Sequence, residues 1–303
     1  MGKNDLKLKD LKKMSDIDIS TPYATVNRLS PSIALTSVAV GLFSPILVSP
    51  IVAIVDGAII NSVNGDGTPI FKGIANGFKE LCGRPHKFFA SYKWQRLTFY
   101  CWLVYGGTYA SGNLIQAYDE ASHTHKESAK MRKVLLTSVV NMGLTAFVKD
   151  PAIVRLMQKL SESGEVNKAS LKPPRPMWWL PRGLFCFRDF ITMFAAFYVA
   201  DSVGEWLMYK GEGQISPQWA RRMGTFGVPV GLQTVSTPIH LLALNLVEMP
   251  QASLMVHGAV IREKYFQACT SRMARIFPAI GLGSNLNNEA RDRALRWLAA
   301  GQN

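Results

Sequence analysis

Residues 97–118, LTFYCWLVYGGTYASGNLIQAY, contain no Asp, Glu, Lys or Arg in 22 consecutive positions. A helix of that length crosses the roughly 30 Å apolar core of a bilayer. Residues 223–247 contain no such charge either, and residues 31–60 contain only Asp56. A soluble helical protein would have to bury residues 97–118 on every side, so the sequence predicts a membrane protein.

Three weaker stretches, residues 134–148, 183–208 and 276–288, are short or carry charged side chains. Charged residues within a span face the interior of the bundle or a wet cavity, because lipid penalises them by several kcal/mol. We therefore expect six transmembrane helices in all. The three weaker ones require a polar interior to shelter them.

The composition supports an ordered membrane protein. Of 303 residues, 48% are apolar and 18% are charged, and the formal net charge is +13. A disordered chain would combine low hydrophobicity with high charge density. The basic charge lies beside long apolar runs, so it does not indicate nucleic-acid binding.

The sequence predicts no metal, no cofactor and no enzymatic activity. The four cysteines, Cys82, Cys101, Cys186 and Cys269, lie too far apart for a zinc site or a disulfide framework. No phosphate-binding loop and no hydrolase motif is present. His123 and His125 could bind a metal together with Asp119 or Glu120, but a solvated connecting loop is the preferred interpretation.

The start of the chain resembles no targeting segment. It lacks the apolar run of a secretory signal, and its four aspartates are atypical of a mitochondrial transit peptide. Leu6 stands where a myristoylation motif needs Ser or Thr. We expect residues 1–29 to form a polar tail that precedes a transmembrane domain of residues 30–300.

A proline recurs at nearly constant spacing. The stretches ILVSP, FVKDP and LVEMP end at Pro50, Pro151 and Pro250, which are 101 and 99 residues apart. Fourteen residues before each proline lies a small hydroxyl residue: Thr36, Thr137 and Ser236. The pattern predicts three repeats of about 100 residues with two spans each, over residues 30–120, 128–210 and 216–300.

These prolines allow two interpretations. A proline inside a helix removes one backbone donor and collides with the preceding turn, so it bends the helix. Three bends at one depth would close one end of a central cavity. In the simpler alternative, the prolines merely end helices.

The repeats, spans and prolines resemble the mitochondrial carrier family, and the resemblance covers residues 30–300. Residues 71–74, FKGI, with the following GFK of residues 77–79, are similar to that family's aromatic-x-Gly matrix-helix motif. Tyr118 and Asp119 resemble its aromatic-acidic pair, which closes the cytoplasmic side. The resemblance implies an all-α, six-helix protein of the mitochondrial inner membrane, with both termini in the intermembrane space.

The resemblance also implies substrate contacts on the even-numbered helices. In carriers these precede the acidic residue of the closing motif by about thirteen positions, and counting back from Asp201 gives Arg188 and Asp189. An arginine can bind a carboxylate or phosphate with two hydrogen bonds, which suits an anionic or zwitterionic metabolite. Alternatively, Arg188 and Asp189 pair with each other or meet lipid headgroups.

The same count from Asp119 gives Gly106 and Gly107. As an alternative to substrate contact, these glycines allow close packing of helices through small residues.

An ion pair is expected between two repeats. The residues two positions before the repeat prolines are Val48, Lys149 and Glu248. In a threefold arrangement Lys149 and Glu248 lie at one level on neighbouring helices, which predicts a Lys149–Glu248 pair that leaves Val48 outside. The alternative is two independent charges at the membrane surface. Asp150 could compete for Lys149 only by bending back, since adjacent helical residues do not face each other.

Two functions follow from this interpretation. The first is a transporter that moves a small, preferably anionic metabolite through a central cavity. The second is a structural or assembly protein that keeps the carrier fold without its gate. The second is suggested by the stretches that begin at the three prolines, which read PIVAIV, PAIVRL and PQASLM. None of them has the acidic and basic residues at the positions that the carrier signature Pro-x-acidic-x-x-basic requires. The expected partners are the bilayer, a small solute and inner-membrane proteins, but no nucleic acid.

Overall fold

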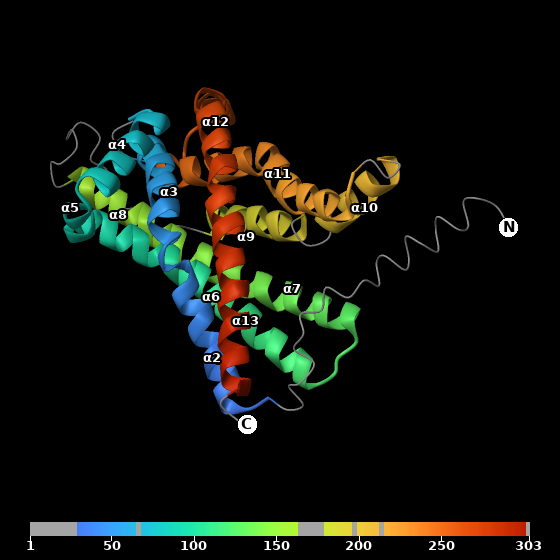
Figure 1. Ribbon diagram of the computed structural model, residues 1–303. Coiled ribbons are helices and arrows are strands. Elements are labelled where there is room, and N and C mark those ends of the chain that lie inside the picture. Colours follow the sequence, from blue (N-terminus) through green and yellow to red (C-terminus); the bar gives the residue numbers. More distant parts are fainter. Residues whose placement is uncertain (1–28, 65–67, 163–178, 196–198, 212–214, 301–303) are drawn as a thin grey trace.

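The structure, a computed structural model, describes residues 29–64, 68–162, 179–195, 199–211 and 215–300 (Figure 1). Every regular element within these ranges is a helix, so the predicted all-α class is confirmed. The tail predicted over residues 1–29 lies outside the described residues except for Leu29.

The first part of the chain forms α2 (Pro31–Phe43), the short 3₁₀ turn η1 (Ser44–Ile46), α3 (Ser49–Asn64), α4 (Ile70–Gly83), α5 (Pro85–Ala90) and α6 (Tyr92–Ala121). The second part forms α7 (Lys126–Gly143), the π-helical η2 (Leu144–Lys149), α8 (Asp150–Glu162), α9 (Trp179–Phe194), α10 (Ala200–Lys210), α11 (Pro217–Glu248), α12 (Leu254–Ile276), the π-helical η5 (Phe277–Ser284) and α13 (Asn285–Ala300). In Figure 1, α2 and α13 lie side by side at the bottom, and α3 and α12 continue them upward. Helices α7, α9 and α11 extend to the right of these two columns.

The first long helical segment is broken. The α2–η1 part and α3 meet at an angle of 56°, on either side of a break at Leu47 and Val48. Here the hydroxyls of Ser44 and Ser49 donate to the carbonyls of Val40 at 2.6 Å and Pro45 at 2.7 Å. The same two carbonyls also accept from the backbone N–H groups of Ser44 and Val48, so it is the serine hydroxyls that find partners here without solvent.

Helix α11 contains two internal prolines, Pro229 and Pro238. Pro238 has no N–H, so the carbonyl four residues earlier, that of Thr234, loses its helical partner. The hydroxyl of Tyr265 on α12 donates to that carbonyl at 3.1 Å. The proline therefore creates a hydrogen bond that joins α11 to α12.

The three repeat prolines differ in their positions relative to the helices. Pro50 is the second residue of α3, where a proline costs no helical hydrogen bond because the first N–H groups have no intrahelical partner. Pro250 lies in the turn after α11, whereas Pro151 follows the π-helical η2 inside the continuous helix Met131–Met157. The simpler interpretation, prolines that mark helix ends, therefore describes Pro50 and Pro250 but not Pro151.

Few helices meet the length and hydropathy of a membrane span. In the described part of the chain they are Met131–Met157 and Phe226–Glu248, with a third if the bent pair α2–α3 counts as one. Residues 97–118 lie in α6 and are not among them, because uncharged Gly, Ser, Thr and Asn lower the mean hydropathy. Six spans in three repeats are not shown.

Polar and apolar side chains are distributed as in a bilayer protein. The apolar core surrounds α3 and includes Ile54, Leu97, Ile153 and Leu244. Many large apolar side chains nevertheless lie on the outer surface: Leu35, Phe43, Leu135, Val139, Phe147, Phe190, Phe266 and Phe277. An apolar exterior around buried charges is what lipid favours.

Candidate functional site

Seven charged side chains lie in the interior of the helix bundle, and we call them the ionic cluster. They are Asp56 of α3, Lys149 and Asp150 at the η2–α8 junction, Arg188 and Asp189 of α9, and Arg272 and Arg275 of α12. The exposed fraction of the side chain is 1% for Asp150 and 19% for Arg275. Charges at membrane depth are rare because they are costly, and they mark functional sites.

Six of these seven side chains form a continuous chain of ion pairs from α12 through α3 and α8 to α9. Asp56 and Asp150 each pair with two cations and Asp189 with one, which offsets part of the cost of burial. The pairs are Arg275–Asp56, Lys149 Nζ–Asp56 Oδ2 at 2.9 Å, Lys149 Nζ–Asp150 Oδ1 at 3.0 Å, Arg188 Nη2–Asp150 Oδ2 at 3.2 Å and Arg188 Nη2–Asp189 Oδ1 at 2.7 Å.

Arg188 lies inside the protein, with 4% of its side chain exposed. Besides its two carboxylates, its Nη1 lies 2.6 Å from Nδ1 of His240 on α11. Its guanidinium also lies over the Phe185 ring, 5.1 Å from the centroid. The predicted neighbours Arg188 and Asp189 do pair with each other, as one alternative had it, but they do so within the larger network.

Arg272 is the seventh member and differs from the other cations of the cluster. It is 3% exposed, and its contacts are neutral: Nε donates to Gln233 Oε1 at 3.1 Å and Nη2 to Ser236 Oγ at 3.5 Å. Among the described residues, no carboxylate lies within ion-pair distance of Arg272. The ionic cluster therefore has one more cation than carboxylates.

Three buried oxygens in or next to the ionic cluster form no hydrogen bond within the described residues: Asp150 Oδ1, Asp189 Oδ2 and the hydroxyl of Thr237 on α11. Asp150 Oδ1 keeps its ion-pair contact with Lys149, whereas the other two have no partner. A buried polar atom left unpaired costs roughly 1–3 kcal/mol, so it requires an explanation.

Lys149 has other partners than the one expected. Its ammonium contacts Asp56 and Asp150, and the expected partner Glu248 is the last residue of α11. Lys149 ends the π-helical η2, whose wider turn changes the direction of the side chains that follow. The sequence did carry a signal for Asp56, since it is the single charge in residues 31–60.

Helix breaks adjoin the ionic cluster. The 56° bend precedes Asp56 on the same segment, η2 ends at Lys149, and η5 begins directly after α12, the helix of Arg272 and Arg275. Interrupted helices with π-helical turns occur at functional sites, and transporters place their binding sites at such breaks.

The predicted glycines pack helices together. A Cβ on Gly107 would lie 2.4 Å from Leu144 Cδ1, at the start of η2, and one on Gly106 would lie 3.4 Å from Leu42 Cδ2. These distances fit the alternative of close helix packing.

The remaining predicted residues lie elsewhere. Asp119 pairs with Arg132 of α7, and the Arg132 guanidinium lies 5.3 Å from the centroid of the Tyr118 ring. Next to them Glu120 pairs with Arg291 of α13 at 2.7 Å. We call Asp119, Glu120, Arg132 and Arg291 the end cluster, because it lies at the C-terminal end of α6. The predicted Asp201 is part of α10.

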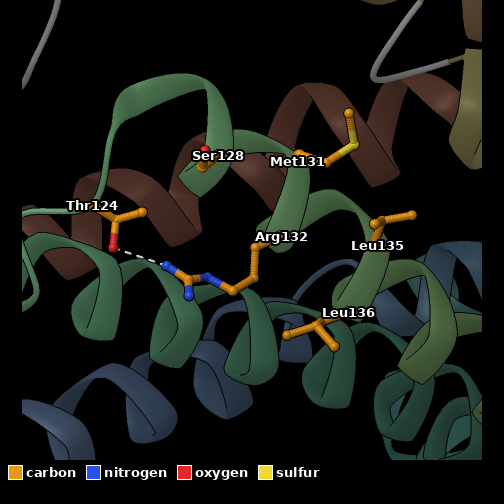
Figure 2. Close-up of a pocket in the computed structure, with 6 residues that line it drawn as sticks. All are labelled: Thr124, Ser128, Met131, Arg132, Leu135 and Leu136. Atoms are coloured by element: carbon orange, nitrogen blue, oxygen red, sulfur yellow. Dashed lines mark hydrogen bonds between the residues drawn. The ribbon is translucent and has the colours of Figure 1, made fainter.

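The end cluster borders a surface groove of about 660 Å³. Figure 2 shows Arg132 reaching toward Thr124, to which its Nη2 donates at 2.9 Å, with Leu135 and Leu136 on the same wall. The lining is mostly apolar, as expected for a surface that meets acyl chains. His123 and His125 are exposed in the adjoining turn, and no group of three metal-ligating side chains occurs among the described residues.

Broken apolar helices around a chain of buried ion pairs define the class: a multi-pass helical membrane protein with a polar interior. Residues 40–295 match the family model described as "Probable citrulline exporter", and the chain belongs to that family. No curated protein and no solved structure matches the chain.

The predicted mitochondrial carrier resemblance is therefore wrong, because the matching family is a different one. The misleading signal was the spacing of Pro50, Pro151 and Pro250. In the structure Pro50 lies at the start of α3, Pro151 lies inside the continuous helix Met131–Met157 and Pro250 follows α11, so the regular spacing does not reflect three equivalent positions.

Proposed function

We propose that this protein exports a zwitterionic amino acid of the citrulline type, and that the ionic cluster is the polar site on its path. The observation that carries the proposal is a continuous set of buried ion pairs at the point where helices are broken. The description of the family supplies the substrate, and the transporter class agrees with the sequence-based prediction of a transported metabolite. We propose no catalytic step, since a transporter needs only to bind and release.

The ion pairs hold together the helices that an exporter must separate. Asp56 joins α3 to α12 through Arg275 and to the η2–α8 junction through Lys149. Asp150 joins α8 to α9 through Arg188. A bound zwitterion supplies one charge of each sign, so it can replace partners that separate during opening. The breaks in the helices provide hinges for that movement.

For the topology we propose six crossings: α2–α3, α6, α7–α8, α9–α10, α11 and α12–α13. Support comes from length, because α6 has 30 residues and α11 has 32, and 20 suffice for a span of about 30 Å. Labelling of single cysteines placed in the connections would show whether successive connections lie on opposite sides of the membrane.

The location of the protein in the mitochondrial inner membrane stays a prediction. Fractionation of cells that express a tagged chain would test it.

Efflux from proteoliposomes tests the proposal. Vesicles containing the purified full chain are loaded with radiolabelled citrulline, and we expect the wild type to release it faster than protein-free vesicles. Asp56→Asn should lower the rate at least about tenfold, because Lys149 and Arg275 lose their shared counter-charge.

Glu289→Gln is the matched control, since Glu289 forms an exposed pair with Arg293 on α13. An Asp56→Asn rate equal to that of the wild type would remove the ionic cluster from the transport path. A folded wild type that releases no amino acid would overturn the exporter and favour the structural or assembly alternative.

A further inference from the structure

One face of α11 carries a stripe of four buried polar side chains: Gln233, Ser236, Thr237 and His240. The spacing of three, four and seven residues places them one above another on the helix. Arg272 binds the Gln233–Ser236 end of the stripe, and Arg188 binds the His240 end. The stripe therefore runs between the pair Arg188–Asp189 and the arginine whose contacts are neutral.

Arg272 needs an anion. A buried guanidinium keeps its charge, and neutral acceptors compensate only part of the solvation that it loses. Within the described residues, Gln233 and Ser236 supply acceptors but no negative charge. A carboxylate is the group whose two oxygens match the fork of a guanidinium.

Asp189 has one oxygen available for a cation. Its Oδ1 accepts from Arg188 Nε at 2.8 Å, whereas its buried Oδ2 has no donor among the described residues. Thr237, midway along the stripe, also has a buried hydroxyl without a partner. One side of the site therefore lacks an anion, and the other lacks hydrogen-bond donors.

The dimensions suit one small molecule. Gln233 and His240 are seven residues apart, which corresponds to about 10 Å along a helix. The amino nitrogen and a carboxylate oxygen of an α-amino acid are about 3 Å apart, and a hydrogen bond of about 2.9 Å at each end extends the reach to about 9 Å.

We propose that Arg272 binds the α-carboxylate and Asp189 the α-ammonium of a zwitterionic amino acid, with the Thr237 hydroxyl as a further donor or acceptor. This inference rests on the proposed function and assigns residues to the two charged ends of its substrate. A neutral side chain such as a ureido group adds no charge to the ionic cluster. A cationic side chain meets repulsion from the surplus of positive charge in the ionic cluster.

Binding to the detergent-purified full chain tests the site without requiring transport. Affinities are measured by isothermal titration for citrulline, for citrulline amide, which lacks the carboxylate, and for Nα-acetylcitrulline, which lacks the ammonium. For the wild type we expect both blocked analogues to bind at least about tenfold more weakly than citrulline. Ornithine, with its second ammonium, should also bind more weakly.

Two variants assign the ends of the substrate. Arg272→Gln should weaken citrulline binding at least about tenfold and remove the preference for citrulline over its amide. Asp189→Asn should remove the preference for citrulline over Nα-acetylcitrulline. Arg291→Gln changes an equally buried arginine of the end cluster and should keep both preferences.

The outcomes separate this inference from the proposed function. Equal wild-type affinity for citrulline and its amide overturns the site even if both substitutions prevent folding. If the protein exports citrulline without these binding preferences, the proposed binding site is wrong and the proposed export function stands. If it binds selectively but exports nothing, the export function is wrong and the binding site stands.

Discussion

The ionic cluster and the end cluster are both built from basic residues and carboxylates, yet their pairs differ. In the end cluster each pair joins a buried side chain, Asp119 or Arg291, to a partly exposed one, with exposed fractions of 36% for Arg132 and 24% for Glu120. In the ionic cluster the exposed fraction of the side chain is 4% for Arg188 and 1% for Asp150. The end cluster ties α6 to α7 and α13 at one end of a helix, whereas the ionic cluster lies where helices are interrupted.

This difference distinguishes ion pairs that hold helices together from buried charges that could bind a ligand. A partly exposed pair contributes about 0–1 kcal/mol, and water can replace either partner. A buried network has no such substitute, so each missing charge leaves its partner uncompensated. Arg272 is a surplus cation in the ionic cluster, whereas both arginines of the end cluster have a carboxylate partner, so the charge balance favours the ionic cluster as the place for an anionic group.

The largest effect expected is that of removing the central cation. Lys149→Met leaves Asp56 with Arg275 alone and Asp150 with Arg188 alone, so the free energy of unfolding should fall by about 3–5 kcal/mol. Lys159→Met, the same change at an exposed position of α8, should alter it by less than about 0.5 kcal/mol. Unfolding by SDS in mixed micelles measures both. Equal effects would show that the ionic cluster contributes no more than a surface charge.

The sequence predicted the fold class and part of the ionic cluster, but not the arrangement. Uncharged runs predicted helices in a membrane, and Arg188 was selected by a count that belongs to another family. Asp56 and Arg275 were missed as partners because 219 residues separate them, and no helical period links positions so distant. The interruption by η2, which brings Lys149 to Asp56 and Asp150, leaves no mark in the apolar stretch before it.

The count of charged residues and the mean hydropathy rank two segments differently. Residues 134–148 were a weak candidate, yet they belong to the span candidate Met131–Met157. Residues 97–118 contain no charge and were a strong candidate, yet their mean hydropathy is too low for them to count as a span candidate. Counting charges does not register the polar Asn113 and Thr108, which are satisfied by contacts with other parts of the chain.

An intermediate effect is expected where α6 packs against the hinge. Gly107→Ala places a Cβ about 2.4 Å from Leu144 Cδ1, so the leucine must move and the packing of η2 on α6 must adjust. We expect a loss of about 1–3 kcal/mol in the free energy of unfolding, as for other enlargements of a packed interior. Gly143→Ala is the control, because nothing lies within 4 Å of the added atom, and it should be neutral or slightly stabilising. No difference between the two variants would mean that this glycine has no role in packing.

The smallest effect is expected in the end cluster, and its dependence on salt is the diagnostic feature. Asp119→Asn removes the carboxylate that pairs with Arg132, but Arg132 keeps its hydrogen bond to Thr124 and its contact with the Tyr118 ring. Because Arg132 is partly exposed, water can replace the lost charge, and the free energy of unfolding should fall by at most about 1 kcal/mol. That loss should shrink further between 0.05 and 0.5 M salt, since the range of the interaction in solution shortens from roughly 14 to 4 Å. The loss caused by Lys149→Met should hardly change over the same range, because ions do not enter the interior. A loss at Asp119 that is as large as that at Lys149 and equally insensitive to salt would abolish the distinction between the two clusters and make the end cluster a second candidate site.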